Sequence, residues 1–104
     1  MEQNSFQLKL KIFWCKDFLG LSINQISVDQ QYFLTPYYFW PKTKAWEQLK
    51  LKLDSIFWLP QTEKLGILKI SSDVMNYWLS YRNTKTVENF KKDFPEVEVL
   101  KLRK

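Results

Sequence analysis

Histidine is absent from the 104-residue sequence, and cysteine, alanine and glycine are nearly so. Without histidine, the Ser–His and Cys–His mechanisms and most zinc sites are excluded. The single cysteine, Cys15, cannot form an intrachain disulfide and has no imidazole to activate its thiol. Two glycines, Gly20 and Gly66, are too few for a phosphate-binding loop. We therefore expect no enzyme, no catalytic residues, no metal site and no cofactor.

Long apolar segments are lacking as well. No apolar run approaches the roughly 18–20 residues that span a membrane. The first residues, Met-Glu-Gln-Asn-Ser, resemble neither a signal peptide nor an Arg- and Ser-rich transit peptide. Of the sixteen basic residues, Arg82 and Arg103 are arginines and the rest are lysines. This residue choice indicates an A/T-rich coding genome, as organelle genomes often are. We expect no membrane contact and no small-molecule substrate.

The chain is rich in aromatic rings and in positive charge. Aromatic residues make up 17% of the chain, and each can bury about 150–250 Å², enough to supply much of one core. The length predicts a single domain over residues 1–104, with flexible tails at 1–5 and 101–104. The net charge of +5 favours an anionic partner such as nucleic acid, but a solvated basic surface explains it equally well.

The N-terminal part of the chain has the two-residue period of β-strands. Apolar residues alternate with polar ones up to residue 14, and the alternation resumes at Leu19. It slips by one residue at Asn24–Gln25, which predicts an antiparallel hairpin with a bulge. Residues 29–42 are predicted to form a loop. In the first strand one face carries Phe6, Leu8, Leu10, Ile12 and Trp14, and the other carries Gln7, Lys9 and Lys11.

The rest of the chain has apolar residues at steps of three and four, which predict helices. The first helix is expected to begin near Pro41, the second to run from about 61 to 82, and the third to be capped by Asn83 or Thr84. A strand, EVEVLKL, ends the pattern. This order predicts an α+β fold in which a small antiparallel or mixed sheet, the N-terminal hairpin plus a C-terminal strand, packs against two to three helices. The helical stripes are Trp46, Leu49, Leu53 and Ile56 or Phe57; then Ile67, Ile70, Val74, Trp78 and Tyr81; then Val87, Phe90 and Phe94.

The segment TPYYFWPKTKAW, residues 35–46, contains five aromatic rings. Such rings can stack on RNA bases, or they can anchor a core. Trp46 lies on a helical stripe and is predicted to be core, while Phe39 and Trp40 can staple the first helical turn to the sheet. Whether Tyr37 and Tyr38 are core or contact residues stays undecided, since a tyrosine hydroxyl favours a solvent-exposed edge of the core and can reach RNA or a protein.

Lys42 and Lys44 lie at the expected start of the first helix. An anion such as a phosphate is stabilised there by the helix dipole and by backbone N–H groups. Two solvated lysines with no ligand are an equally good interpretation. The candidate RNA-binding residues are Lys9, Lys11, Tyr37, Lys42, Lys44, Lys101, Arg103 and Lys104.

Two blocks, LTPYYFWPKTKAWEQLK and ILKISSDVMNYWLSYRN, resemble the signature blocks of the plastid-specific ribosomal protein 3 family, which comprises small-subunit ribosomal proteins of chloroplasts with cyanobacterial relatives. The resemblance covers about residues 6–82. Lys42 stands where the family usually has arginine, Lys44 where an acidic residue is common, and the chain after residue 83 matches no family pattern. The matching residues are Tyr38, Phe39, Trp40, Pro41, Ala45, Trp46, Glu47 and Leu49, then Asn76, Tyr77 and Trp78.

The resemblance implies a structural constituent of the small subunit of a plastid ribosome, which contacts ribosomal RNA and neighbouring ribosomal proteins and supports translation. Two other functions remain open: a free protein-interaction module with aromatic anchors, and a translational regulator that visits the ribosome transiently. The absence of a transit peptide and the A/T-rich residue choice lead us to expect a plastid-encoded chain, made inside the chloroplast.

Overall fold

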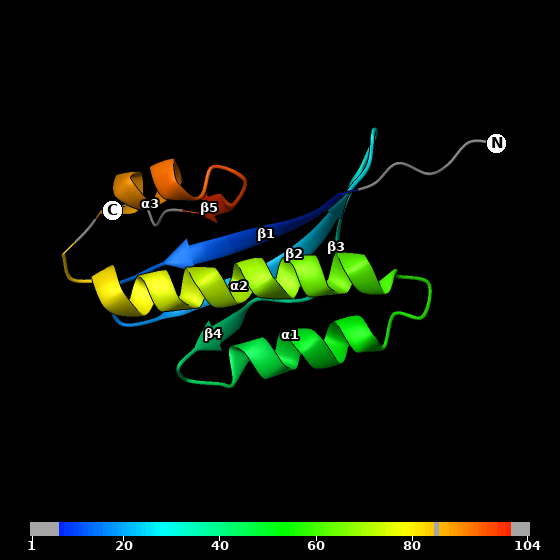
Figure 1. Cartoon of the computed structure of the whole chain (residues 1–104), viewed down its shortest axis with the longest axis horizontal. Helices are drawn as coiled ribbons and strands as arrows, with labels where there is room; N and C mark the ends of the chain where they lie inside the picture. Colours follow the sequence, from blue (N-terminus) through cyan, green and yellow to red (C-terminus); the bar gives the residue numbers. More distant parts are fainter. Residues whose placement is uncertain (1–6, 85, 101–104) are drawn as a thin grey trace.

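The computed structural model describes residues 7–84 and 86–100, which form five strands and three helices (Figure 1). The predicted α+β fold is confirmed. The expected tails, 1–5 and 101–104, lie outside the described residues. The strands are β1 Gln7–Trp14, β2 Leu19–Ile26, β3 Gln31–Phe33, β4 Tyr38–Trp40 and β5 Glu98–Leu100; the helices are α1 Ala45–Asp54, α2 Gln61–Tyr81 and α3 Val87–Asp93.

The sheet is mixed and is built around β1 and β2. These two strands form the predicted antiparallel hairpin, with Gln7 opposite Ile26 and Trp14 opposite Leu19. β5 joins the other edge of β1 in parallel. The second edge of β2 is shared, because β3 pairs with its C-terminal end and β4 with its N-terminal end. The strand order is therefore β3-β2-β1-β5, with β4 also paired to β2.

Two expectations about the strands are wrong. The register runs without interruption through Asn24 and Gln25, so the predicted bulge does not form. Ser22 and Asn24 are buried there by the segment that follows β2, because Ser22 Oγ donates to the carbonyl of Thr35 at 3.1 Å and Asn24 Nδ2 donates to Gln31 Oε1 at 2.8 Å, whereas Gln25 and Ile26 are only half-buried at the end of the strand. The predicted loop at 29–42 contains β3 and β4, whose three residues each are too few to show a period.

Thr35 joins β3 and β4 to the middle of β2. Its hydroxyl accepts a hydrogen bond from the backbone N–H of Ile23 at 3.0 Å, and its carbonyl accepts one from Ser22 Oγ at 3.1 Å. Thr35 is 2% exposed. The segment therefore follows β2 along its length, and it pairs the buried hydroxyls of Ser22 and Thr35 and the backbone N–H of Ile23.

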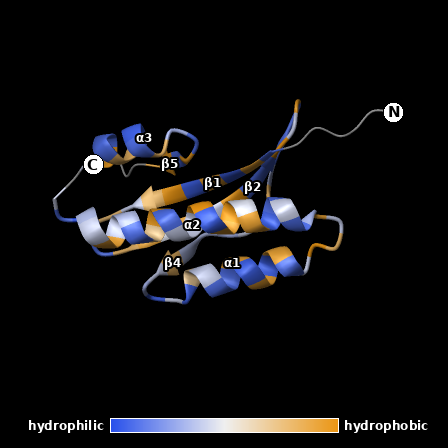
Figure 2. Cartoon of the chain, in the orientation of Figure 1, coloured by the Kyte–Doolittle hydropathy of each residue, from blue (hydrophilic) through white to orange (hydrophobic). Residues whose placement is uncertain are grey.

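All three helices pack on the same face of the sheet, where they bury the apolar residues that the strands turn towards them. Hydrophobic and hydrophilic residues form alternating bands around α1 and α2 (Figure 2), as expected for helices with one buried face. α3 reaches the same core through Phe90, whose ring lies 5.1 Å from that of Trp14. The core includes Leu10, Ile12, Leu19, Leu21, Ile23, Leu49, Leu53, Val74, Trp78 and Phe90.

The bounds of the second helix are confirmed, but two helix starts are wrong. α1 begins at Ala45, not near Pro41, because β4 stays paired with β2 up to Trp40 and the chain must turn before a helix can form. The turn is closed by Thr43 N–H, which donates to the carbonyl of Phe39 at 2.8 Å. The cap of α3 is Thr86, which forms a capping box with Asn89.

The tryptophans of the two long helices link the elements of the core. Trp78 is fully buried, and its Nε1 donates to the carbonyl of Cys15 at 2.7 Å. Trp46 is half-buried against the core, and its Nε1 donates to the carbonyl of Leu68 at 3.0 Å. Of the alternative ends for the first stripe, Ile56 packs against the core while Phe57 is 93% exposed.

Candidate nucleic-acid interface

The second face of the sheet is not covered by the described helices, and we call it the open face. Residues paired across neighbouring strands share a face, so the register assigns its members. β1 and β2 bring Lys9 opposite Asn24, Lys11 opposite Ser22 and Phe13 opposite Gly20. Neighbouring strands add Phe33, Phe39, Glu98 and Leu100.

Four half-buried rings gather at one end of the open face: Phe13, Phe18, Tyr37 and Phe39, here called the four-ring cluster. Phe18 meets Phe39 edge to face, with centroids 5.4 Å apart and planes at 87°. Tyr37 lies nearly parallel to Phe39 at 6.2 Å. Phe13 contacts all three of the others at 6.0–6.5 Å. The cluster therefore presents partly exposed rings that come from three separate segments.

Gly20 makes room for the cluster. A Cβ atom at this position would lie 2.8 Å from Cε1 of Phe39 and 2.9 Å from Cβ of Phe13, closer than carbon atoms approach. The ring of Phe39 therefore lies across the backbone of β2, where a larger residue would displace it. This placement corrects the expectation that Phe39 staples the first helical turn. Phe39 faces away from the helices, whereas Trp40, its neighbour in β4, packs against Trp78 at 5.4 Å.

A cavity of about 570 Å³ opens beside the four-ring cluster. It lies between the β1–β2 turn, which supplies Asp17 and Phe18, and the segment from β4 to α1, which supplies Phe39, Pro41 and Lys42. Its lining combines two rings and a proline with one carboxylate and one ammonium group. Such a cavity can hold a flat apolar group that also carries polar edges.

The candidate residue Lys11 already has partners. Its Nζ lies 3.9 Å from a carboxylate oxygen of Glu98 and 5.4 Å from the centre of the Phe33 ring, and its side chain is 12% exposed. A cation over an aromatic face is stabilised by the ring quadrupole. Lys11 is therefore held in place on the open face rather than extended into solvent.

The candidate residue Tyr37 lies in the four-ring cluster. Its hydroxyl is buried and has no hydrogen-bond partner among the described residues. Burial, followed by the negative charge of Glu98, raises the pKa of this hydroxyl above its ordinary value. Tyr37 therefore stays neutral and offers a ring more readily than a hydroxyl. Its neighbour Tyr38 packs against the core on the other face.

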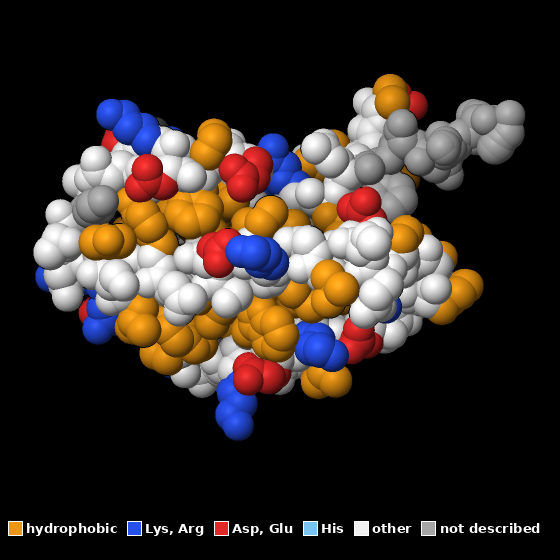
Figure 3. Space-filling model, viewed as in Figure 1, with side chains coloured by type: hydrophobic (Ala, Val, Ile, Leu, Met, Phe, Trp, Pro, Cys, Tyr) orange, Lys and Arg blue, Asp and Glu red, His pale blue; other side chains and the backbone are white. Residues whose placement is uncertain are grey.

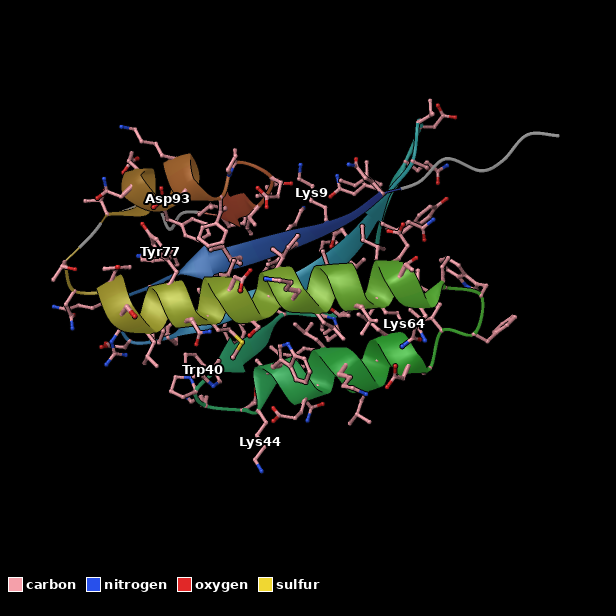
Figure 4. All side chains as sticks on the ribbon, viewed as in Figure 1. Lys9, Trp40, Lys44, Lys64, Tyr77 and Asp93 are labelled. Atoms are coloured by element: carbon pink, nitrogen blue, oxygen red, sulfur yellow. The ribbon has the colours of Figure 1, made fainter. Side chains whose placement is uncertain are left out.

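The remaining described candidates fall into separate places. Lys9 is half-buried on β1, and Lys42 is exposed and lines the cavity. Lys44 is the N-cap residue of α1 and points away from the body of the protein, on the opposite side of the view from Lys9 (Figure 4). No ion pair involves these three within the described ranges 7–84 and 86–100. Lys101, Arg103 and Lys104 lie outside those ranges.

The helix-covered face has a different character. Hydrophobic side chains gather on both sides of α2, and acidic side chains lie close to basic ones (Figure 3). Lys50 pairs with Asp54 at 2.9 Å, and Lys64 reaches the same carboxylate at 3.8 Å. Farther along α2, Lys69 pairs with Asp73 at 3.0 Å. Lys50, Lys64 and Lys69 are therefore neutralised locally, which directs attention to the open face and to the start of α1.

Other kinds of site find little support in the described part of the chain. Burial, followed by the charge of Asp17, raises the pKa of the Cys15 thiol, so the reactive thiolate is disfavoured. Among residues 7–84 and 86–100, no three His, Cys, Asp or Glu side chains are grouped so as to hold a metal ion. No helix of the same residues has the length and apolar character that crossing a membrane requires.

Sequence reasoning missed most of the four-ring cluster. Phe13 continues the alternation of Gln7, Lys9 and Lys11, so the pattern predicted that it shares their face of the strand. Phe18 lies in a turn, where no period exists, and the side of Phe39 depends on the pairing of β4 with β2. These two residues become visible as site residues once the sheet is assembled.

Comparison with known proteins finds one family model and several relatives that all point to the same kind of protein. Residues 34–81 match the family described as plastid and cyanobacterial ribosomal protein (PSRP-3/Ycf65). The chain is 30% identical over 88 residues to a probable small ribosomal subunit protein cS23 of a Synechococcus strain, covering 85% of this chain and 89% of that protein. It is 35% identical over 94 residues to small ribosomal subunit protein cS23 of Cyanidium caldarium, covering 90% and 85%. The barley protein of the same name is 33% identical over 82 residues, covering 74% and 43%.

Proposed function

Because this chain belongs to the family of plastid and cyanobacterial ribosomal proteins, we propose that it is a structural constituent of the small subunit of a plastid ribosome. The relatives in a cyanobacterium, a red alga and barley are all named as small ribosomal subunit proteins. The role is to hold ribosomal RNA and neighbouring ribosomal proteins in place, without catalysis and without a small-molecule substrate, and residues 1–104 act in it as one domain.

The contact with ribosomal RNA is proposed to be mainly to phosphates. Lys9, Lys42 and Lys44 have no ion pair among the described residues and are available for phosphate oxygens. Lys11 and Tyr37 are secondary contacts, since both already pack within the open face. Lys101, Arg103 and Lys104 add further charge and remain candidates from the sequence alone.

The observation that carries this proposal is the open face itself. The described helices leave it uncovered, and it carries lysines beside partly exposed rings. RNA-binding sheets use this combination, with cations for the backbone and aromatic faces for unstacked bases. A face left open by the fold of a small basic protein is well suited to bind a larger particle that covers it.

The proposed place of action is the plastid. Relatives in algal and plant species, together with the A/T-rich residue choice, support a plastid ribosome. We further propose that the chain is encoded in the plastid. Detection of the coding sequence in plastid DNA of the source organism decides this point, and a nuclear copy alone would contradict it.

Sedimentation of the chain with small ribosomal subunits tests the function. A structural constituent stays with the small subunit through washes in high salt, whereas a transient regulator is removed and a free interaction module never co-sediments. Binding to small-subunit RNA should weaken with salt at a slope of about −0.7 to −0.9 per phosphate contacted. A salt-independent affinity would contradict contact through phosphates.

The variant Lys42→Glu/Lys44→Glu tests the lysines at the start of α1. Both side chains are exposed, so the fold should remain, as judged by circular dichroism, while incorporation into the small subunit falls. Lys50→Glu is the matched control, because Lys50 is on α1 but already pairs with Asp54 on the helix-covered face. Equal incorporation of both variants would place the RNA contact elsewhere.

A further inference from the structure

We propose that the cavity beside Phe18 and Phe39 takes one unpaired base of RNA. The inference rests on the proposed binding of ribosomal RNA and adds to it a specific place and a specific chemical group. A base that has left the RNA helix is a flat ring with hydrogen-bond donors and acceptors at its edge, attached to a phosphate. The cavity offers a counterpart to each of these three features.

The two rings supply the stacking surface. Phe18 and Phe39 stand at 87° to each other, so a base lying flat on one ring meets the edge of the other. Their partners in the four-ring cluster and the close fit of Phe39 over Gly20 hold the rings in position. A stacking surface that is already formed loses little conformational entropy when a ligand binds.

The charged residues supply the polar contacts. Lys42 is exposed at the cavity and carries a positive charge for the phosphate of the bound nucleotide. Asp17 carries a carboxylate, which accepts hydrogen bonds from the amino and ring N–H groups of bases. Pro41 adds an apolar wall. An apolar side chain from a protein would use the rings but would leave both charges without a partner, so the charges favour a nucleotide.

The experiment uses the full chain and two RNA hairpins that differ by one unpaired nucleotide in the stem. Fluorescence anisotropy gives the affinity for each, and the ratio of the two affinities is the readout. Stacking of one base on an aromatic ring contributes roughly 5- to 150-fold. We expect the bulged hairpin to bind more tightly than the fully paired hairpin by a factor in this range, whereas both share the phosphate contacts.

Phe18→Leu should abolish most of this preference while the affinity for the paired hairpin stays the same. Phe57→Leu is the matched control, since Phe57 is 93% exposed and lies between α1 and α2. Asp17→Asn provides a second variant at an exposed position in a turn. It should lower the preference and raise the affinity for paired RNA slightly, because a negative charge is removed.

The outcomes separate this inference from the proposed function. Binding to both hairpins with no preference, or a preference that Phe18→Leu leaves intact, overturns the base site but leaves ribosomal RNA binding standing. No binding to either hairpin together with no co-sedimentation overturns both. A Phe18→Leu variant that keeps its RNA preference but fails to join the small subunit shows that the cavity holds a protein side chain, and also overturns the inference.

Discussion

Replacing Trp78 by phenylalanine should destabilise the protein far more than the removal of one polar group at a surface would. Trp78 is fully buried, and its indole N–H donates to the carbonyl of Cys15 at 2.7 Å, a link between α2 and the β1–β2 turn. The change takes the indole donor away from this part-buried carbonyl, which costs about 1–3 kcal/mol. The smaller ring adds a cavity term of about 1 kcal/mol next to Trp40.

The sum, about 2–4 kcal/mol, is a large part of the roughly 5–15 kcal/mol that stabilises a domain. At about 4–8 °C per kcal/mol for a domain of this size, the melting temperature should fall by at least 8 °C. Thermal unfolding followed by circular dichroism measures the change. Phenylalanine is preferred to alanine, because Trp78→Ala costs about 3–5 kcal/mol and leaves little folded protein to study.

Two matched variants decide whether burial is the cause. Leu79→Ala alters the next residue, which is 56% exposed, and should change stability by no more than about 0.5 kcal/mol. Trp46→Phe also loses an indole hydrogen bond, to the carbonyl of Leu68, but the ring of Trp46 is half-buried whereas that of Trp78 is fully buried, so less packing is lost. Its cost should lie between the other two. A melting temperature for Trp78→Phe equal to that of Leu79→Ala would refute the reasoning.

Three further predictions concern the helices. Burial and a hydrogen bond to Asp93 at 2.9 Å raise the pKa of Tyr77 to about 12, so the stability that this hydroxyl contributes is fully present below pH 10 and is lost between pH 10 and 12. Ultraviolet titration of tyrosinate in wild type and Tyr77→Phe measures this pKa, and a value near 10 would contradict the prediction. Thr86→Ala removes the cap of α3 and should cost about 1 kcal/mol, seen as faster amide exchange in that helix, whereas an unchanged exchange rate would argue against the cap. The hydrogen bond from Lys50 and the charges of Lys50 and Lys64 lower the pKa of Asp54. Asp54→Asn should therefore be less stable than wild type at neutral pH, and equally stable at a pH below the lowered pKa, where the carboxylate is protonated. A difference in stability that persists in acid would mean that the side chain acts by packing.

The parts of the fold with a long, regular pattern were predictable. The alternation over residues 6–14 predicted the first strand of the hairpin, and the stripe from Ile67 to Trp78 after Pro60 predicted α2 nearly to the residue. β3 and β4 escaped prediction because three residues show no period. The late start of α1 has the same origin, since β4 holds the chain extended up to Trp40.

The candidate site was less predictable than the fold. The sequence indicated which lysines share a strand face with Lys9, but not whether helices would cover that face. Lys42 and Lys44 are two residues apart, yet Lys42 lines the cavity and Lys44 occupies the N-cap position of α1 without a capping hydrogen bond. The assembly of Phe13, Phe18 and Phe39 depends on contacts between segments far apart in the chain. Tertiary packing, which no local pattern encodes, therefore decides the composition of the interface.

The pairing of β5 with β1 has a consequence for how the protein emerges from the ribosome that makes it. Lys11 lies opposite Glu98, so the outer edge of β1 stays unpaired until residue 98 has been synthesised. Synthesis from the N-terminus leaves that edge, with its free backbone N–H and C=O groups, open to pairing with other nascent chains. Folding of the hairpin can begin early, whereas closure of the sheet depends on the synthesis of β5.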